Sequence, residues 1–424
     1  MNRNYRIVFN RKLGIHQVAS EHTRAQGIGG AVVRAAGLAV TLLAGLHLAP
    51  ALAVDLTIAG GVSINSAGDA DYGYIAVGSS GTGVASLTID SGHTYTGSLL
   101  LTAGNVSEGS VTVSGTGSTL TFSGANIGTV ANGTLLIENG GTVGGSSMNI
   151  GYGHSGSGMV TVTGAGSTLN ITDYLRVARV GDGILNIENG GKVSVNGLLT
   201  VGYGGNGTLN LLGTSGNRGI LETAALRGGS GAVTINGGIL RATTNQSDFF
   251  QDFNPGEVVI ASGGFFFDTN GYDVGADIDL EGTGGLTKQG TGTLTLTGTN
   301  IYSGGTTVEA GTLQIGNGGT TGSILGNITN DSALTFNRSD AQTYAGIISG
   351  TGSFTKLGDG TLTLSGKSTY SGTTTVSAGT LQAGVADTIA SSSALTVESG
   401  ATFALNNFAQ TIGSLAGGRE CHAW

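Results

Sequence analysis

Few of the residue types that do chemistry occur close together in this sequence. Neither His93 nor His154 has a second histidine or a cysteine nearby, although metal sites and Ser/His/Asp sites both need several polar side chains to converge. The pattern G-x-S-x-G, which places a nucleophilic serine on a strand-to-helix turn, does not occur. We therefore expect no catalytic residues, no metal and no cofactor. The six histidines are His16, His22, His47, His93, His154 and His422.

Four carboxylates could serve an enzyme that acts on polysaccharides: Glu138, Glu188, Asp173 and Asp182. Glu138 and Glu188 each follow an isoleucine and precede Asn-Gly-Gly in copies of one repeated segment. Equivalent positions in a repeat indicate a structural ladder rather than an acid/base pair. A polysaccharide-acting enzyme is therefore the less favoured hypothesis.

Two segments match the pattern G-x-G-x-x-G, which in dinucleotide-binding proteins connects a strand to a helix. The matches lie at equivalent positions of a glycine-rich repeat, and no amphipathic helix is predicted after either of them. We expect them to be turns. The glycines are Gly151, Gly153 and Gly156 in the first match, and Gly202, Gly204 and Gly207 in the second.

Composition predicts an all-β chain. Glycine accounts for 81 of 424 residues, prolines number two, and there is one cysteine, Cys421, which can form no internal disulfide. With 38% apolar and 10% charged residues the chain should bury a core rather than be disordered. After residue 53 there are eleven Lys/Arg and twenty-five Asp/Glu, an acidic balance that disfavours a nucleic-acid partner.

Two kinds of internal repeat follow one another. In the first, residues 111–120 recur at 160–169 and residues 135–141 recur at 185–191, spacings of 49 and 50 residues that fit about two rungs of a coiled chain. In the second, residues 286–313 recur at 354–381, with an offset of 68. Leu294 and Leu296 alternate with threonines there, which is the period of a half-buried strand.

Short strands of this kind need similar neighbours stacked above and below to bury their apolar face. Short, repeated strand–turn units with glycine at the corners predict a parallel β-helix, an elongated rod. Between the two repeat types the segment 244–281 is rich in phenylalanine. We interpret it as an irregular rung whose rings fill the core, with Phe265 and Phe267 on one face and Phe266 on the other.

The N-terminus predicts export. An apolar run at 35–48 precedes Ala51-Leu52-Ala53, an A-x-A cleavage pattern, so we expect a signal peptide cleaved between Ala53 and Val54. The run is short for a permanent membrane anchor, which needs about 20 residues. Residues 1–25, with the pattern M-N-x-x-Y-R-x-x-x-N-x-x-x-G-x-x-Q-V-x-S-E, resemble the extended signal peptide region of type V secreted proteins.

The second repeats, over about 257–418, resemble the autotransporter-associated β-strand repeat of passenger domains. Together the two resemblances imply an adhesin-type autotransporter passenger with a right-handed parallel β-helix (β-solenoid). The expected organisation is an extended signal peptide at 1–53, first-type repeats at 54–243, the aromatic-rich connecting rung at 244–281, β-strand repeats at 282–418 and a non-repeat tail at 419–424.

The resemblance implies a surface adhesin or self-association protein, and no enzyme. Its expected partners are the Sec export machinery, an outer-membrane β-barrel translocator and a host-cell or abiotic surface, or a second copy of the chain. No translocator sequence follows residue 418, so we expect a truncated form that accumulates in the periplasm. A two-partner-secretion exoprotein, whose barrel is a separate chain, remains an alternative.

Overall fold

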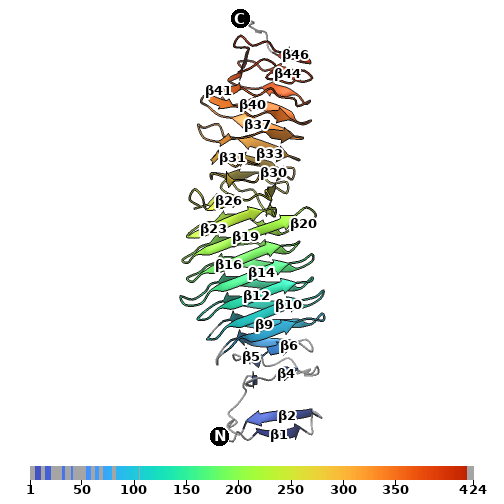
Figure 1. Cartoon of the computed structure of the whole chain (residues 1–424), viewed down its shortest axis with the longest axis vertical. Coiled ribbons are helices and arrows are strands. Elements are labelled where there is room, and N and C mark those ends of the chain that lie inside the picture. Colours follow the sequence, from blue (N-terminus) through green and yellow to red (C-terminus); the bar gives the residue numbers. More distant parts are fainter. Residues whose placement is uncertain are drawn as a thin grey trace.

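The computed structural model describes residues 5–10, 15–20, 31–33, 40–41, 54–58, 63–65, 70–78, 83–104 and 106–417. Within these ranges, side chains are described from residue 75 onward except at 97–102. The chain winds into an elongated stack of short parallel strands, and the described ranges contain strands and turns but no helix (Figure 1). The all-β, parallel β-solenoid expected from the sequence is therefore confirmed.

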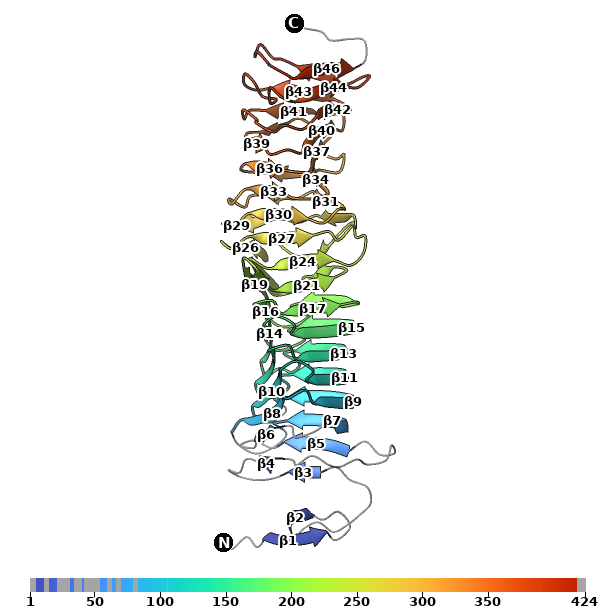
Figure 2. The same ribbon diagram turned by 90° about the vertical axis from the view of Figure 1, so that its right-hand side faces the viewer.

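One sheet of the solenoid is built from one strand of each rung in the first part of the chain (Figure 2). Its strands are in register, so that Gly109, Gly133, Gly158, Gly183 and Gly207 form one column. One rung extends from each of these glycines to the next, and the two-rung spacing predicted from the first repeats is confirmed. The strands are β4 (Val40–Thr41), β6 (Ser63–Asn65), β8 (Ala85–Ile89), β10 (Gly109–Ser114), β12 (Gly133–Glu138), β14 (Gly158–Thr163), β16 (Gly183–Glu188), β19 (Gly207–Thr214), β23 (Gly231–Asn236), β26 (Val258–Ile260) and β29 (Glu281–Gly282).

The second sheet faces the first across the core and continues further along the chain. Its early strands are long and bend at an irregularity in the register, after which the two halves become separate strands. It comprises β3 (Ala31–Val33), β5 (Val54–Ile58), β7 (Ala70–Val77), β9 (Thr94–Ala103), β11 (Thr119–Ile127), β13 (Thr142–Ile150), β15 (Thr168–Val177), β17 (Lys192–Val195), β18 (Leu198–Val201), β21 (Ile220–Thr223), β22 (Leu226–Arg227), β24 (Ile239–Ala242), β25 (Phe250–Gln251), β27 (Phe265–Asp268), β30 (Leu286–Gln289), β33 (Thr306–Val308), β36 (Ile328–Asn330) and β39 (Ile348–Ser349).

The remaining parallel stacks complete the later rungs, which are shorter than the early ones; β31, β34 and β37, for example, begin at Thr293, Thr312 and Ala333. One stack contains β28 (Val274–Ala276), β31 (Thr293–Leu296), β34 (Thr312–Ile315), β37 (Ala333–Asn337), β40 (Ser353–Leu357), β42 (Thr374–Val376), β44 (Ala394–Val397) and β46 (Ser414–Gly417). Another contains β38 (Gln342–Tyr344), β41 (Thr361–Leu364), β43 (Thr380–Ala383) and β45 (Thr402–Ala404), and β32 (Thr299–Asn300) pairs with β35 (Ser323–Ile324).

The core is a column of aliphatic side chains that each strand supplies at alternate positions. In β10, for example, Val111 and Val113 are fully buried while Thr112 and Ser114 lie on the outer side. Each buried aliphatic side chain contributes roughly 1.5–3 kcal/mol relative to exposure. A single rung supplies only a few of these side chains, so each rung is stable only when neighbouring rungs cover its core.

The two copies of the second repeat lie on different faces of the solenoid. The first copy places Leu286–Gln289 in the second sheet and Thr293–Leu296 in the next stack. The second copy places the matching Ser353–Leu357 in that next stack and Thr361–Leu364 in a further one. The offset between the copies therefore corresponds to three of the shorter rungs plus the length of one face. The same repeat therefore occupies two different positions around the solenoid.

The phenylalanines of the segment 244–281 fill the core, as the sequence predicts. Phe265 and Phe267 are buried, and they pack edge-to-face with Phe249 and Phe250 at ring-centroid distances of 5.2–6.4 Å. Phe266 lies on the outer face, where the Arg218 guanidinium stacks 3.4 Å from the centre of its ring. Arg218 reaches it from β20 (Asn217–Arg218), which pairs antiparallel with the end of β19.

The first strands of the chain are described only as backbone. β1 (Tyr5–Asn10) and β2 (Ile15–Ser20) form an antiparallel pair, and β3 and β4 pair with β5 and β6. Ala51 and Ala53 of the predicted cleavage site lie outside the described residues, whereas Val54 begins β5. Among the described residues, no helix has the length and apolar character that crossing a membrane requires.

Each second-type repeat buries one lysine near the end of a strand, Lys288 in β30 and Lys356 in β40. Lys288 and Lys356 are almost fully buried, and their ammonium groups donate to carbonyl oxygens of their own rung and of the next one. Lys288 also donates to the hydroxyl of Thr269 at 3.0 Å. The acceptors are Gln289, Gly290 and Ala310 for Lys288, at 2.8, 2.7 and 3.0 Å, and the repeat-equivalent Leu357, Gly358 and Ala378 for Lys356, at 3.4, 2.7 and 3.2 Å.

Burial lowers the pKa of Lys288 to about 8, although the carboxylates of Asp268 and Asp273 act in the opposite direction. Burial likewise lowers the pKa of Lys356. A lysine whose pKa is lower in the folded chain than the usual 10.5 binds fewer protons there than in the unfolded chain. Stability must then rise with pH between these two values.

We predict that Lys288→Met weakens this pH dependence. In the unaltered chain the free energy of unfolding should rise between pH 8 and 9.5, by up to ~1.4 kcal/mol per pH unit for this lysine. The window stays below pH 10, where the buried tyrosines begin to oppose the effect because burial raises their pKa. Thermal unfolding followed by circular dichroism at both pH values measures this change in stability.

Lys367→Met, at a lysine whose side chain is 68% exposed, is the control and should leave the pH dependence unchanged. An unchanged pH dependence in Lys288→Met would contradict the prediction.

Candidate binding surface

The carboxylates considered in the sequence do not converge. Glu138 and Glu188 end equivalent strands of the first sheet, with Thr163 of β14 in the rung between them. Two rungs separate stacked residues by roughly 10 Å. Asp173 lies in the exposed bend of β15, and Asp182 lies in a corner loop. Only Asp182 joins a group of polar side chains.

The histidines also lie apart. His93 lies in the turn before β9, where its main-chain carbonyl accepts a hydrogen bond from the amide of Thr119. His154 lies in the loop between β13 and β14. Those are different corners of the solenoid. No group of three or more His, Cys, Asp or Glu that could hold a metal ion occurs in the described part of the chain.

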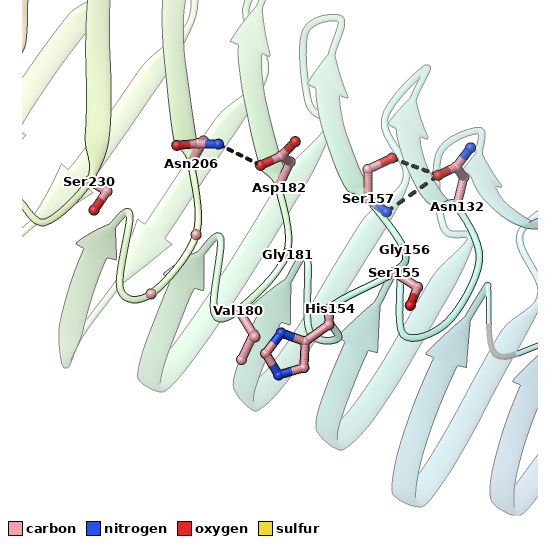
Figure 3. A pocket seen from close by; sticks show the side chains of 12 residues that line it. Asn132, His154, Ser155, Gly156, Ser157, Val180, Gly181, Asp182, Asn206 and Ser230 are labelled. Atoms are coloured by element: carbon pink, nitrogen blue, oxygen red, sulfur yellow. Dashed lines mark hydrogen bonds between the residues drawn. The ribbon is translucent and has the colours of Figure 1, made fainter.

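A polar groove runs across successive rungs at the corner that connects the second sheet to the first (Figure 3). Its volume is about 420 Å³. Three consecutive corner loops provide most of its walls, and the side chains of His154 and Val180 stand at its outer edge in Figure 3. The lining residues are Asn132, His154, Ser155, Gly156, Ser157, Val180, Gly181, Asp182, Gly204, Gly205, Asn206 and Ser230.

A row of small polar side chains lies along one side of this groove. Each member directly precedes the glycine that begins a strand of the first sheet, so the row has one residue per rung. The row consists of Glu108, Asn132, Ser157, Asp182, Asn206 and Ser230.

Hydrogen bonds connect some neighbours in the row and not others. The Oδ1 of Asn132 accepts from the Ser157 hydroxyl at 2.8 Å, and the Asn206 amide donates to Asp182 Oδ1 at 3.0 Å. No hydrogen bond joins Ser157 to Asp182, or Asn206 to Ser230, within the described residues. The groove spans these two breaks.

Both G-x-G-x-x-G segments lie in the loops that form the groove, and they are turns, as expected. Gly151 and Gly202 have φ of +65° and +79°, a conformation that other residues rarely adopt. At Gly153 a Cβ atom would overlap the carbonyl oxygen of Thr129 in the rung below. The glycines therefore allow loops of adjacent rungs to stack at the corner. No helix follows them in the described residues, so the segments lack the context of a nucleotide site.

Beside the groove, tyrosine and arginine alternate at equivalent positions of three rungs. Tyr152, Arg179 and Tyr203 each directly follow the first residue of a corner loop. The guanidinium of Arg179 stacks 4.5 Å from the ring centre of Tyr152. The guanidinium of Arg176 lies 4.2 and 4.5 Å from the ring centres of Tyr174 and Tyr203. Tyr203 remains 57% exposed.

This cluster of tyrosine and arginine was not predicted from the sequence. The signal was present, because the Gly-Tyr-Gly segments at 151–153 and 202–204 are copies two rungs apart, and the rung between them has Ala-Arg-Val at 178–180. A tyrosine that recurs at an outward corner position has no role in the core and is a candidate for contact with a ligand.

Comparison with known proteins matches two family models. The model for the extended signal peptide of the type V secretion system matches residues 1–50, and the model for the passenger-associated transport repeat matches residues 286–315 and 354–383. The chain is also 34% identical over 259 residues to the adhesin BmaC autotransporter of Brucella suis biovar 1 (strain 1330). That similarity covers 55% of this chain but only 7% of the relative.

The signal-region match links the N-terminus of the chain to type V secretion, and the solenoid is the fold that this resemblance implies. Together with the repeats and the similar adhesin, it supports an autotransporter passenger of the adhesin type, as the resemblances in the sequence imply.

We predict that Gly153→Ala destabilises the solenoid and that Gly144→Ala does not. At Gly153 the added methyl would overlap main chain, which cannot rotate away, so we expect a loss of ~1–3 kcal/mol. At Gly144 the nearest atom would lie 3.7 Å away, an ordinary contact. Thermal unfolding of both variants measures the difference. Equal melting temperatures would show that the loops at this corner are not closely stacked.

Proposed function

We propose that this chain is an exported autotransporter passenger that acts as a surface adhesin through its repetitive β-solenoid. The similarity over 259 residues to a protein named as an adhesin carries the proposal. In this proposal the Sec machinery exports the chain, an outer-membrane translocator delivers it, and the cell surface is its location. No enzymatic activity is proposed.

The outer faces of the solenoid support this function because they repeat one chemistry many times. Thr335, Thr355, Thr375 and Thr396, for example, form a column of outward threonines on four successive rungs. A flat column of identical hydroxyl groups can make many weak contacts with a host cell, with an abiotic surface or with a second copy of the chain. Many weak contacts give strong attachment by avidity.

Adhesion by avidity predicts that the protein attaches much more strongly when many copies coat one bead than when it is free in solution. Beads coated with the full chain should attach to host cells or to plastic well above albumin-coated beads. The free chain should compete only weakly, with an apparent affinity roughly 100-fold or more below that of the beads.

Coated beads that attach no better than albumin-coated beads would contradict the proposal. Release of sugar fragments from a glycan by the unaltered chain, abolished in Glu188→Gln, would favour the enzyme alternative instead.

Export predicts a defined new N-terminus. Cleavage after Ala53 would remove β1 to β4 and leave β5, which begins at Val54, as the first strand. N-terminal sequencing of exported protein should therefore begin at Val54. The double variant Ala51→Asp, Ala53→Asp should block this processing, since signal cleavage needs small residues at both positions. A start well before Val54 in the unaltered chain would contradict the predicted site.

A further inference from the structure

The corner groove has the composition of a site for a ligand rich in hydroxyl groups. Most binding pockets are apolar with a few polar groups, whereas Val180 is the one large aliphatic side chain among the lining residues. The others are hydroxyl, amide, carboxylate and imidazole groups, together with glycines at which a Cβ atom would overlap the main chain of a neighbouring loop. Such groups offer both donors and acceptors at short range.

Several of these groups keep unused hydrogen-bonding capacity. Asp182 uses Oδ1 to accept from Asn206, and no hydrogen bond within the described residues engages its Oδ2 or the Oδ1 of Asn206. Ser155 is exposed and His154 stands at the edge of the groove (Figure 3). A carboxylate and an amide held side by side can bind adjacent hydroxyl groups of one sugar ring, accepting from one and exchanging bonds with the other.

The charges around the groove favour an uncharged ligand. Asp182 is the only carboxylate among the lining residues, and none of them is an arginine or a lysine. The guanidinium of Arg179, the residue before Val180, is stacked on Tyr152. An anionic chain such as a nucleic acid would meet Asp182 without a matching row of cations.

The spacing of the polar row suits a linear chain of sugars. Asn132, Ser157, Asp182, Asn206 and Ser230 recur once per rung, at the ~4.8 Å separation of stacked strands. One sugar unit of an extended polysaccharide has a similar length. A glycan that follows the solenoid axis would meet one polar side chain per unit.

We propose that this groove binds a linear, uncharged glycan laid along the solenoid axis. The inference deepens the proposed adhesin function by naming the ligand class, and it rests on that function for its biological setting. The groove supplies specificity for the sugar, and the repetition of passengers on a surface supplies avidity.

The test uses the full chain and an array of linear hexasaccharides, some built from neutral hexoses or N-acetylhexosamines and some containing uronic acids. Binding to the best neutral oligosaccharide is then measured by isothermal titration calorimetry. Asp182→Ala combined with Asn206→Ala removes the central pair of the row. Ser155→Trp fills the groove and leaves the hydrogen-bonding groups of the polar row unaltered.

The matched control is Asn186→Ala combined with Asn210→Ala. These asparagines form a similar hydrogen-bonded pair, 2.8 Å apart, on neighbouring rungs of the flat first sheet and outside the groove. We expect binding of the neutral glycan to fall by roughly tenfold or more in both groove variants and to be unchanged in the control. Melting temperatures identify any variant that has lost its fold. If the double variant has unfolded, Ser155→Trp provides the test.

Three results would overturn the inference: no glycan bound by the unaltered chain, equal binding by Ser155→Trp, or binding confined to uronate-containing glycans. The bead assay separates these results from the proposed function. Attachment of beads that persists in folded groove variants leaves adhesion standing and removes the groove from it. Glycan binding without bead attachment supports the site but contradicts the adhesin.

Discussion

The stacking of one rung directly on the next is the constraint on which the rest of the structure depends. In a solenoid the neighbours of a residue are the residues one rung away, so each position must suit its equivalents above and below. The close approach is most severe at the corners. There, Gly153 lies against the main chain of Thr129, and Gly181 against that of Gly153. The high glycine content follows from these contacts, and it brings the polar side chains of successive loops into one row.

The same constraint explains how rungs of two lengths can share one core. Before the rungs shorten, outward residues of the second sheet form a charged cluster, in which Glu222 accepts from Lys192 at 2.8 Å and from Arg241 at 3.0 Å, and Arg241 contacts Asp268 at 2.7 Å. Burial alone would raise the pKa of Glu222, but the bonds from its partners outweigh it and hold the pKa below its usual value. Inside, the edge-to-face phenylalanines fill the space that smaller side chains occupy elsewhere.

Periodicity predicted the solenoid because apolar alternation and repeat spacing are properties of each rung by itself. Periodicity could not predict which face of the solenoid a repeat occupies. The number of residues between two copies gives their relative position around the axis only when the number of residues per rung is known. The inward position of Lys288 was readable from the alternation in Leu286-Thr287-Lys288. Its partners were not, because carbonyl oxygens of the next rung have no signature in the sequence. The groove was missed for a related reason, since its glycines are recognisable only as turns until the loops are stacked.

Stacking also provides a way to separate structural rows from those available for a ligand. On the first sheet, stacked polar side chains bond to one another, as Asn210 does to Asn186 and Asn186 does to Thr161. These bonds help to hold the rungs together. In the corner row the ladder is interrupted between Ser157 and Asp182 and again after Asn206, at the rungs that the groove spans. Packing in the core does not dictate these side chains, because they lie outside the strands and their alternation. The residue types in the corner row can therefore be selected for binding a ligand, whereas the residue types on the sheets are those that stacking requires.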